Sequence, residues 1–272
     1  MVNERENQKR LEAAKYAAIK AGKMLVASEA SEVHSKGWHD FVTEMDLESE
    51  KIIIDYLSKR FPTDNFFSEE RGGNCDSGTG LWIIDPIDGT GDFIHDIPCY
   101  TISIAYRNSS GELSIGVIYN PRQRELFWAG RGIGAFLNRN PIHVSCLSDP
   151  SDAYTIMSPH PRLHKEAPFF FNLMKNIFLV SMDLRNFGSA ALHLAYVACG
   201  RVDAFLHQGL KLYDIAAGLV ILNEAGGRYS GFLEDENVIE TGNLVATNGA
   251  LHDWYISQIR CGGFRTYGDT KD

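Results

Sequence analysis

The hydrophobic pattern begins with two helical segments. Between Gln8 and Ser28 apolar residues recur every three or four positions, which predicts an amphipathic helix. A second helix is expected over Asp46–Arg60, and Phe61-Pro62 ends it because proline cannot continue the backbone hydrogen bonds. The polar, glycine-containing stretch between the helices, EVHSKGWHDFVTEMD, is expected to form a loop. The apolar side of the first helix consists of Leu11, Ala14, Ala18, Ala21 and Leu25.

Short apolar runs separated by turns dominate the chain from residue 65 to about 145. Turn sequences such as RNSSGE and YNPRQRE lie between the runs, and this arrangement predicts an antiparallel meander. The expected strands are Asn65–Ser68, Leu81–Ile84, Thr101–Tyr106, Ser114–Tyr119, Glu125–Ala129 and Ala135–Leu137.

From residue 150 strand and helix patterns alternate. Strands are expected at Ala153–Met157, Ile177–Met182, Val202–His207 and Leu244–Thr247, and helices at Ala190–Cys199, Tyr213–Glu224 and His252–Arg260. The whole pattern predicts an α+β protein with two layered halves, 1–145 and 146–272, that form one compact unit.

Charge and cysteine content limit the partners and the compartment. The 272 residues carry a formal net charge of −9, spread along the chain, which argues against the basic face that a nucleic-acid partner needs. No apolar run approaches the ~18–20 residues of a membrane span, and the charged N-terminus lacks the apolar core of a signal peptide. The five cysteines are odd in number and form no CxxC pair. We therefore expect a cytoplasmic protein without a nucleic-acid or membrane partner.

The stretch LWIIDPIDGTGDF, Leu81 to Phe93, places two carboxylates directly after a buried strand. Asp85 and Asp88 would repel each other unless a cation lies between them. Pro86 fixes the backbone, so that the carbonyl of Ile87 can turn inward as a neutral ligand. The glycines that follow can bring backbone N–H groups close to an anion. These features favour a site for metal and phosphate.

Other acids lie at the ends of predicted elements. Glu69 follows a strand, and Asp46 and Asp214 stand at helix starts. Each alone has an ordinary structural explanation, because an aspartate at a helix start is usually an N-cap and a surface Glu-Glu pair is usually a solvated turn. Together with Asp85 and Asp88, however, they form an all-oxygen set that suits Mg²⁺ and a substrate phosphate.

Several of these stretches match one known family. WIIDPIDGTGDF resembles the pattern W-I-[IV]-D-P-[IL]-D-G-T-x-N-F of the inositol monophosphatase family, and LYDIAAGLVILNEAGG resembles its W-D-x-A-A-G…E-A-G-G. VTEMD, SEERG and RNFGSAALHLAYVACGRVDAF match further segments in the same order. The resemblance runs from about Ala13 to Ala250. It implies a layered αβαβα sandwich, usually a homodimer, that hydrolyses small phosphate monoesters with Mg²⁺ and is sensitive to lithium.

The resemblance also implies a ligand set for two or three Mg²⁺ ions. Glu69, Asp85 and the Ile87 carbonyl would hold the first ion, and Glu69 would take part in catalysis. Asp85, Asp88 and Asp214 would hold the second, and Asp88 would also contact the substrate. Glu69 would help to hold a third ion more loosely.

Further roles follow from the same resemblance. Thr90, hydrogen-bonded to Asp46, would position the attacking water as part of the catalytic machinery. The backbone amides of Gly89 and Thr90 would bind the phosphate. Ala190 resembles a substrate contact, and Lys36 lies in a loop that resembles the mobile flap of the family.

Three positions depart from the family pattern. Asp92 replaces an asparagine and Tyr213 replaces a tryptophan, and neither change removes an expected ligand. His207 stands where inositol phosphatases carry a glutamate that accepts hydrogen bonds from sugar hydroxyls. An imidazole can also donate, so inositol phosphate becomes a weaker candidate for the substrate.

The alternatives left open are phosphatases for histidinol phosphate, fructose 1,6-bisphosphate or a nucleotide 3′-phosphate on the same fold. A non-catalytic regulatory protein is the remaining one, although no expected metal ligand is missing.

Overall fold

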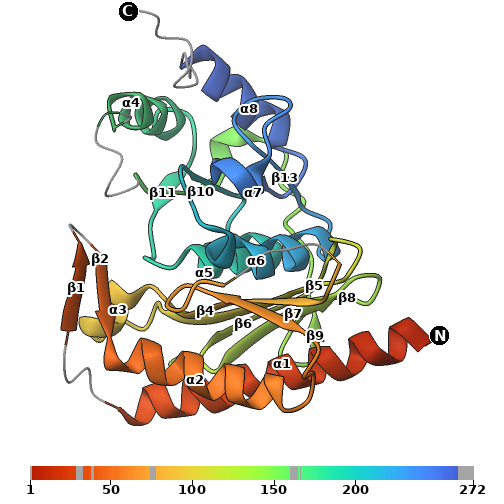
Figure 1. The fold of residues 1–272 in the computed structure, drawn as a ribbon. Coiled ribbons are helices and arrows are strands. Elements are labelled where there is room, and N and C mark those ends of the chain that lie inside the picture. Colours follow the sequence, from red (N-terminus) through yellow and green to blue (C-terminus); the bar gives the residue numbers. More distant parts are fainter. Residues whose placement is uncertain are drawn as a thin grey trace, which may run out of the picture.

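Helices and sheets alternate in five stacked layers in the computed structural model (Figure 1). The structure describes residues 2–28, 33–37, 40–73, 78–159, 165 and 167–262. From the N-terminal side, the layers are a helix pair, a seven-stranded sheet, a second helix pair, a five-stranded sheet and outer helices. This αβαβα order confirms the predicted fold class.

The first layer consists of α1 (Val2–Ala27) and α2 (Glu44–Ser58), which lie along one face of the larger sheet (Figure 1). The five apolar residues that the sequence placed on one side of the first helix are all buried. They pack in one core with Trp82, Ile84 and Val117 of the sheet. The helix therefore lies over the predicted range, held by the burial of that side, but it begins earlier, at Val2.

The second layer is the sheet in the order β3-β4-β5-β6-β7-β8-β9. From β4 onward each neighbouring pair is antiparallel, as the predicted meander requires, whereas β3 runs parallel to β4. The strands are β3 (Asn65–Ser68), β4 (Leu81–Asp88), β5 (Thr101–Arg107), β6 (Leu113–Asn120), β7 (Glu125–Gly130), β8 (Gly134–Leu137) and β9 (Asn140–Pro141).

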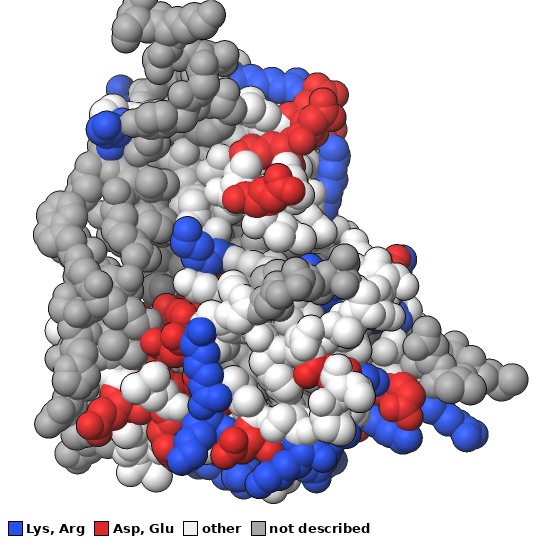
Figure 2. Space-filling view, in the orientation of Figure 1, with Lys and Arg blue, Asp and Glu red and all other residues white. Residues whose placement is uncertain are grey.

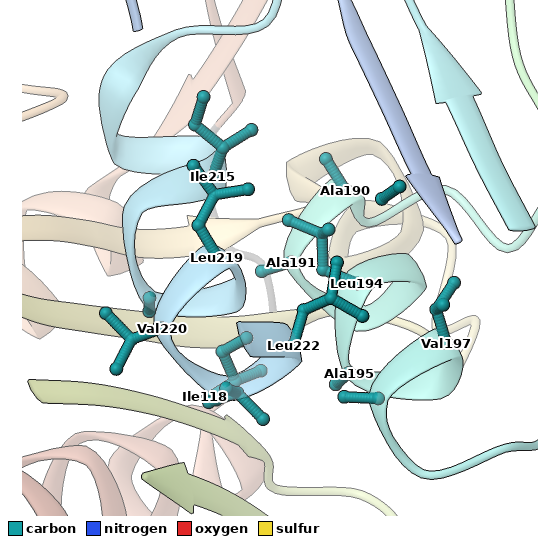
Figure 3. Close-up of a cluster of buried hydrophobic side chains, with 14 of the residues drawn as sticks. Ile118, Ala190, Ala191, Leu194, Ala195, Val197, Ile215, Leu219, Val220 and Leu222 are labelled. Atoms are coloured by element: carbon teal, nitrogen blue, oxygen red, sulfur yellow. The ribbon is translucent and has the colours of Figure 1, made fainter. Parts of the chain in front are cut away.

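The third layer is formed by α5 (Ala190–Ala198) and α6 (Leu212–Glu224) on the other face of this sheet. Figure 3 shows their apolar side chains meeting one another and Ile118 of β6. Glycine permits α6 to lie close to β6, because a Cβ atom on Gly116 would lie 2.2 Å from the carbonyl oxygen of Ala217. One on Gly218 would lie 2.4 Å from the Cδ1 atom of Leu194.

The fourth layer is a mixed sheet in the order β11-β10-β12-β14-β13, and helices α4 and α8 cover its outer face (Figure 1). The strands are β10 (Tyr154–Met157), β11 (Asp183–Arg185), β12 (Ala204–His207), β13 (Arg228–Ser230) and β14 (Leu244–Thr247). The helices are α4 (Ala167–Phe178), α7 (Val238–Thr241) and α8 (His252–Cys261), and a 3₁₀ turn spans Pro150–Asp152.

Two predicted segments have a different structure. The expected loop between the first helices contains a two-stranded hairpin, β1 (Val33–Gly37) and β2 (Asp40–Thr43). The expected strand at 177–182 is instead the end of α4 and the turn after it. Phe170, Leu173 and Ile177 are buried at helical spacing, whereas the apolar residues that follow are exposed. A continuous apolar run cannot by itself distinguish these cases.

Charged side chains are mixed on the face that Figure 2 shows. Lys and Arg side chains alternate with Asp and Glu side chains over the lower part of this face, where Figure 1 places α2. Among the described residues, no helix has both the length and the apolar character needed to cross a membrane.

Candidate functional site

The carboxyl end of β4 carries the two aspartates that the sequence singled out. The strand continues to Asp88 rather than ending at Ile84, and all of its residues are buried. Asp85 pairs with Ser103 and Asp88 with Thr101, so three steps along β4 match two along β5. In a regular strand, residues three apart face opposite sides of the sheet. The extra residue forms a bulge, which lets both carboxylates approach the same point.

Asp88 is tied to the start of α5, about one hundred residues further along the chain. Its Oδ2 atom accepts hydrogen bonds from the Ser189 hydroxyl and from the backbone N–H of Ala191, both at 2.6 Å. Ser189 is the N-cap of α5 and its hydroxyl also lies 3.0 Å from that of Thr101. The positive end of the helix dipole therefore faces a buried carboxylate.

Asp214 reaches the same place from the first turn of α6. The backbone N–H of Lys211 donates to its Oδ2 atom at 2.6 Å, so the side chain also caps the helix. One carboxylate oxygen from each of Asp85, Asp88 and Asp214 lies within 4.8 Å of the others. The structure thus brings together three acids from β4 and α6, which are distant in sequence.

Burial and crowding perturb the pKa values of these acids. Burial raises the pKa of Asp85 well above its usual range, and the charges of Glu69 and Asp88 raise it further. Burial raises the pKa of Asp88 to about 6 against the opposing effect of its hydrogen bonds. The pKa of Asp214 is also raised, first by burial and then by the charge of Asp88.

Glu69 stands beside this cluster at the end of β3. Its backbone N–H donates to the carbonyl of Ile84 at 3.1 Å, immediately before Asp85, and its side chain is half-buried. Its charge raises the pKa of Asp85, although Glu69 is not one of the three acids whose oxygens lie within 4.8 Å of one another.

Thr90 begins the short helix α3 (Thr90–Ile94), directly after the β4 aspartates. Its hydroxyl lies 3.3 Å from Asp46 Oδ1 and 3.0 Å from the carbonyl oxygen of Ile87. Asp46 is fully buried, and its Oδ2 accepts from the N–H and the hydroxyl of Thr43, each at 2.7 Å. The family resemblance implied the contact between Thr90 and Asp46. Asp46 also has the capping role considered from the sequence, although the N-cap itself is Thr43 and Asp46 completes a capping box from the third position of α2.

The remaining expected site residues are more scattered. Gly89 has a left-handed backbone with φ of +91°, which turns the chain from β4 into α3. Ala190 is the first residue of α5 and adjoins the Asp88 contacts. His207 ends β12, buried, with its ring centroid 5.9 Å from that of Phe205. Lys36 falls in β1, and its side chain lies outside the described residues.

Sequence reasoning missed three polar contacts at this site. Ser189 was quoted only as part of a longer motif, although a serine before an apolar run is a standard N-cap signal. Ser49 and Glu50 are fully buried on α2 and contact the segments that carry the acids. Their spacing from Asp46 on a predicted helix was the available signal.

The donor set fits a divalent cation with oxygen ligands. Asp85 and Asp88 are buried and Asp214 is half-buried. Carboxylates this close would repel or take up protons unless a cation neutralised them, and their raised pKa values express that cost. Among the clustered groups there is no thiolate or imidazole, so a hard ion such as Mg²⁺ suits the set better than zinc.

Comparison with known proteins places this geometry in a family. The sequence model of the Inositol monophosphatase family matches residues 6–263. The chain belongs to this family. The resemblance that the motifs carried is thereby confirmed, and membership supports a phosphatase on this fold.

Individual relatives are similar along most of their length. The chain is 40% identical to Nus factor SuhB of Salmonella typhimurium over 250 residues, covering 90% of this chain and 93% of that protein. It is 39% identical over 223 residues to a fructose-1,6-bisphosphatase/inositol-1-monophosphatase of Thermotoga maritima, covering 82% and 84%. The crystal structure of the extragenic suppressor protein suhB of Bartonella henselae superposes with a TM-score of 0.88 at 34% identity, covering 93% and 98%.

Proposed function

We propose that this protein is a Mg²⁺-dependent phosphomonoesterase that hydrolyses a small polyol or sugar phosphate. The observation that carries the proposal is the convergence of Asp85, Asp88 and Asp214 within 4.8 Å at the end of β4. Family membership supports the reaction class.

In this proposal, Asp85, Asp88, Asp214, Glu69 and the Ile87 carbonyl hold two or three Mg²⁺ ions. When bound, the ions supply positive charge for the phosphate and lower the pKa of bound water. Three of these carboxylates, on Asp85, Asp88 and Asp214, already lie together in the fold, so little ordering of them is needed on binding.

Thr90 and Asp46 position the attacking water. Asp46 is fixed by two hydrogen bonds from Thr43, which leaves its Oδ1 atom at 3.3 Å from the Thr90 hydroxyl. With its proton directed to Asp46 or to the Ile87 carbonyl, the Thr90 oxygen can accept a hydrogen bond from water. That bond orients the water lone pair toward the phosphorus atom.

The start of α3 binds the phosphate. Gly89 adopts a backbone with φ of +91°, and a Cβ atom there would lie 3.4 Å from the Cys99 carbonyl oxygen, the Ser189 Cβ and the Tyr100 Cα. A side chain would be strained in this conformation, so glycine keeps the turn open. The N–H groups of Gly89 and Thr90 then donate to phosphate oxygens.

His207 selects the substrate in this proposal. It is buried at the end of β12, on the same face as Phe205. A neutral imidazole offers one donor and one acceptor, whereas a glutamate offers acceptors only. We therefore favour a substrate other than inositol phosphate, with a sugar phosphate first, since one relative is named a fructose-1,6-bisphosphatase/inositol-1-monophosphatase.

Two further properties belong to the proposal through family membership. Millimolar Li⁺ should inhibit the Mg²⁺-dependent activity, which an inhibition series at fixed Mg²⁺ measures. The protein should be a homodimer, which light scattering after gel filtration tests.

A regulatory role is the second candidate, because a 40% identical relative is named a Nus factor. The two roles are compatible, since the acidic cluster is intact in this chain. A folded wild-type protein that hydrolyses no ester would favour regulation alone.

The deciding experiment measures phosphate release from a panel of esters. The panel contains inositol 1-phosphate, fructose 1,6-bisphosphate, histidinol phosphate, a nucleoside 3′-phosphate and p-nitrophenyl phosphate, each with Mg²⁺ and with EDTA. Asp88→Asn, purified in parallel, shows whether a contaminating phosphatase contributes. We expect Mg²⁺-dependent release that the variant lacks. Equal release by both proteins, or equal release in EDTA, would contradict the proposal.

A further inference from the structure

Helix α2 presents a buried polar face to the site, which is unusual because buried helix faces are normally apolar. Asp46, Ser49 and Glu50 are all 0% exposed. Their spacing of three and four residues places them on one side of the helix. Each contacts a different segment of the site, since Asp46 meets Thr90 and the Ser49 hydroxyl donates to the carbonyl of Pro86 at 2.9 Å.

Glu50 binds both sides of the turn that carries Glu69. Its Oε1 atom accepts a hydrogen bond from the Ser68 hydroxyl and another, at 3.1 Å, from the backbone N–H of Arg71. Its Oε2 atom forms an ion pair with Arg71, whose Nε lies 2.8 Å away and whose side chain is 55% exposed. One buried carboxylate therefore holds the turn on both sides of Glu69, through the Ser68 hydroxyl before it and the Arg71 backbone N–H after it.

Backbone hydrogen bonds also act on the turn. Ser68 and Gly72 exchange backbone hydrogen bonds of 3.0 and 2.9 Å, which close the turn but do not orient it toward β4. The N–H of Glu69 attaches it to Ile84, next to Asp85. The Glu50 contacts add a restraint from α2 to this attachment at β4, and so help to fix where the Glu69 carboxylate lies.

We propose that Glu50 is a positioning residue that holds the Glu69 carboxylate toward Asp85 and thereby sets the metal affinity of the site. This inference rests on the proposed metal-dependent function. A buried ionised carboxylate is costly unless it is paired and hydrogen-bonded, and Glu50 has both kinds of partner. Removing a group that hydrogen-bonds directly to a metal ligand typically weakens metal binding by about 10–100-fold. Glu50 acts on the neighbours of Glu69, so we expect the lower end of this range.

The test uses Glu50→Gln and Arg71→Gln in the full chain. The glutamine oxygen can still accept from Ser68 and from the Arg71 backbone, but its NH₂ group cannot pair with the guanidinium. Mn²⁺ binding is followed by the electron paramagnetic resonance signal of the free ion, and Mg²⁺ dependence by phosphate release. We expect the half-saturating metal concentration to rise about 10-fold in Glu50→Gln, and by a smaller factor in Arg71→Gln. Turnover at saturating Mg²⁺ should stay within about twofold of wild type.

Glu48→Gln is the matched control, because it is the same change at an exposed position of the same helix. A merely structural role would lower the melting temperature and turnover while leaving the metal midpoint unchanged, and that result would overturn the inference. If Glu50→Gln fails to fold, Arg71→Gln decides alone, since its side chain is largely exposed. Wild type that binds no Mn²⁺ would refute both this inference and the proposed function. Wild type that binds and hydrolyses normally, with unchanged variants, would refute the inference only.

Discussion

Replacing Asp88 with asparagine should remove activity and stabilise the metal-free protein. Asp88 is 9% exposed, and burial raises its pKa from 3.8 to about 6. A pKa difference of about two corresponds to about 3 kcal/mol between the protonated and ionised forms. Asparagine keeps an oxygen that can accept from Ser189 and Ala191, but it carries no charge to desolvate.

The sign of the pH dependence follows from proton binding. Because the folded pKa is the higher one, the native protein binds more protons than the unfolded chain between about pH 4 and pH 6. The free energy of unfolding therefore falls as pH rises through this window, and the full cost of about 3 kcal/mol is present above it. Asp88→Asn should not carry that cost. Its melting temperature should therefore be about 5–10 °C higher than that of wild type at pH 8 in EDTA.

The assay is urea unfolding in EDTA at pH 5 and pH 8. Wild type should lose about 1.5 kcal/mol more than Asp88→Asn between the two conditions, since part of the cost is already present at pH 5. Asp235→Asn makes the same change at an exposed position and should follow wild type. Saturating Mg²⁺ should stabilise wild type much more than it stabilises the variant. The turnover of the variant should be at least ~10²-fold lower than that of wild type. An unchanged pH dependence in the variant would show that the Asp88 carboxylate does not bear this cost.

Three other substitutions test separate parts of the site and fold. Thr90→Val should lower turnover about 10²-fold with little change in the Mg²⁺ midpoint, because it removes the hydroxyl 3.3 Å from Asp46 and no carboxylate; a shifted midpoint would instead point to a metal-binding role. Gly116→Ala should destabilise the protein by roughly 1–3 kcal/mol in urea unfolding, because the new Cβ would lie 2.2 Å from the Ala217 carbonyl oxygen; a neutral result would mean that α6 can move away from the sheet freely. His207→Glu should improve kcat/KM for inositol 1-phosphate by roughly 5–100-fold and leave p-nitrophenyl phosphate unaffected, whereas parallel effects on both esters would retire the specificity role.

The sequence predicted most elements because their burial patterns are local. The strands of the larger sheet and the amphipathic side of α1 lie where apolar spacing placed them, and every residue of β4 is buried. The strand-end and helix-start acids Asp85, Asp88 and Asp214 were expected to gather, and the structure brings them together. Their roles as metal ligands stay predictions.

What the sequence could not provide depends on contacts between distant segments. The bulge after Asp85 is defined by pairing with Thr101 and Ser103, so its existence cannot be read from β4 alone. The bond from Ser189 to Asp88 spans 101 residues. Glu50 looks like one more charged residue of a surface helix until the fold buries it against the turn at residue 71.

The two helices that enter the site from the C-terminal half also explain how the fold tolerates its acids before any cation binds. Asp88 accepts from the N-terminal turn of α5, and Asp214 lies in the first turn of α6. Hydroxyls of β5 hold both helix starts in place, because Thr101 contacts Ser189 at 3.0 Å and Ser103 donates to the Tyr213 carbonyl at 3.3 Å. The positive ends of two helix dipoles thus face the carboxylates, each worth up to ~2 kcal/mol in buried geometry. This offsets only part of the burial and repulsion that keep the pKa of Asp85 and Asp214 raised, and the remainder is what favours binding of a cation.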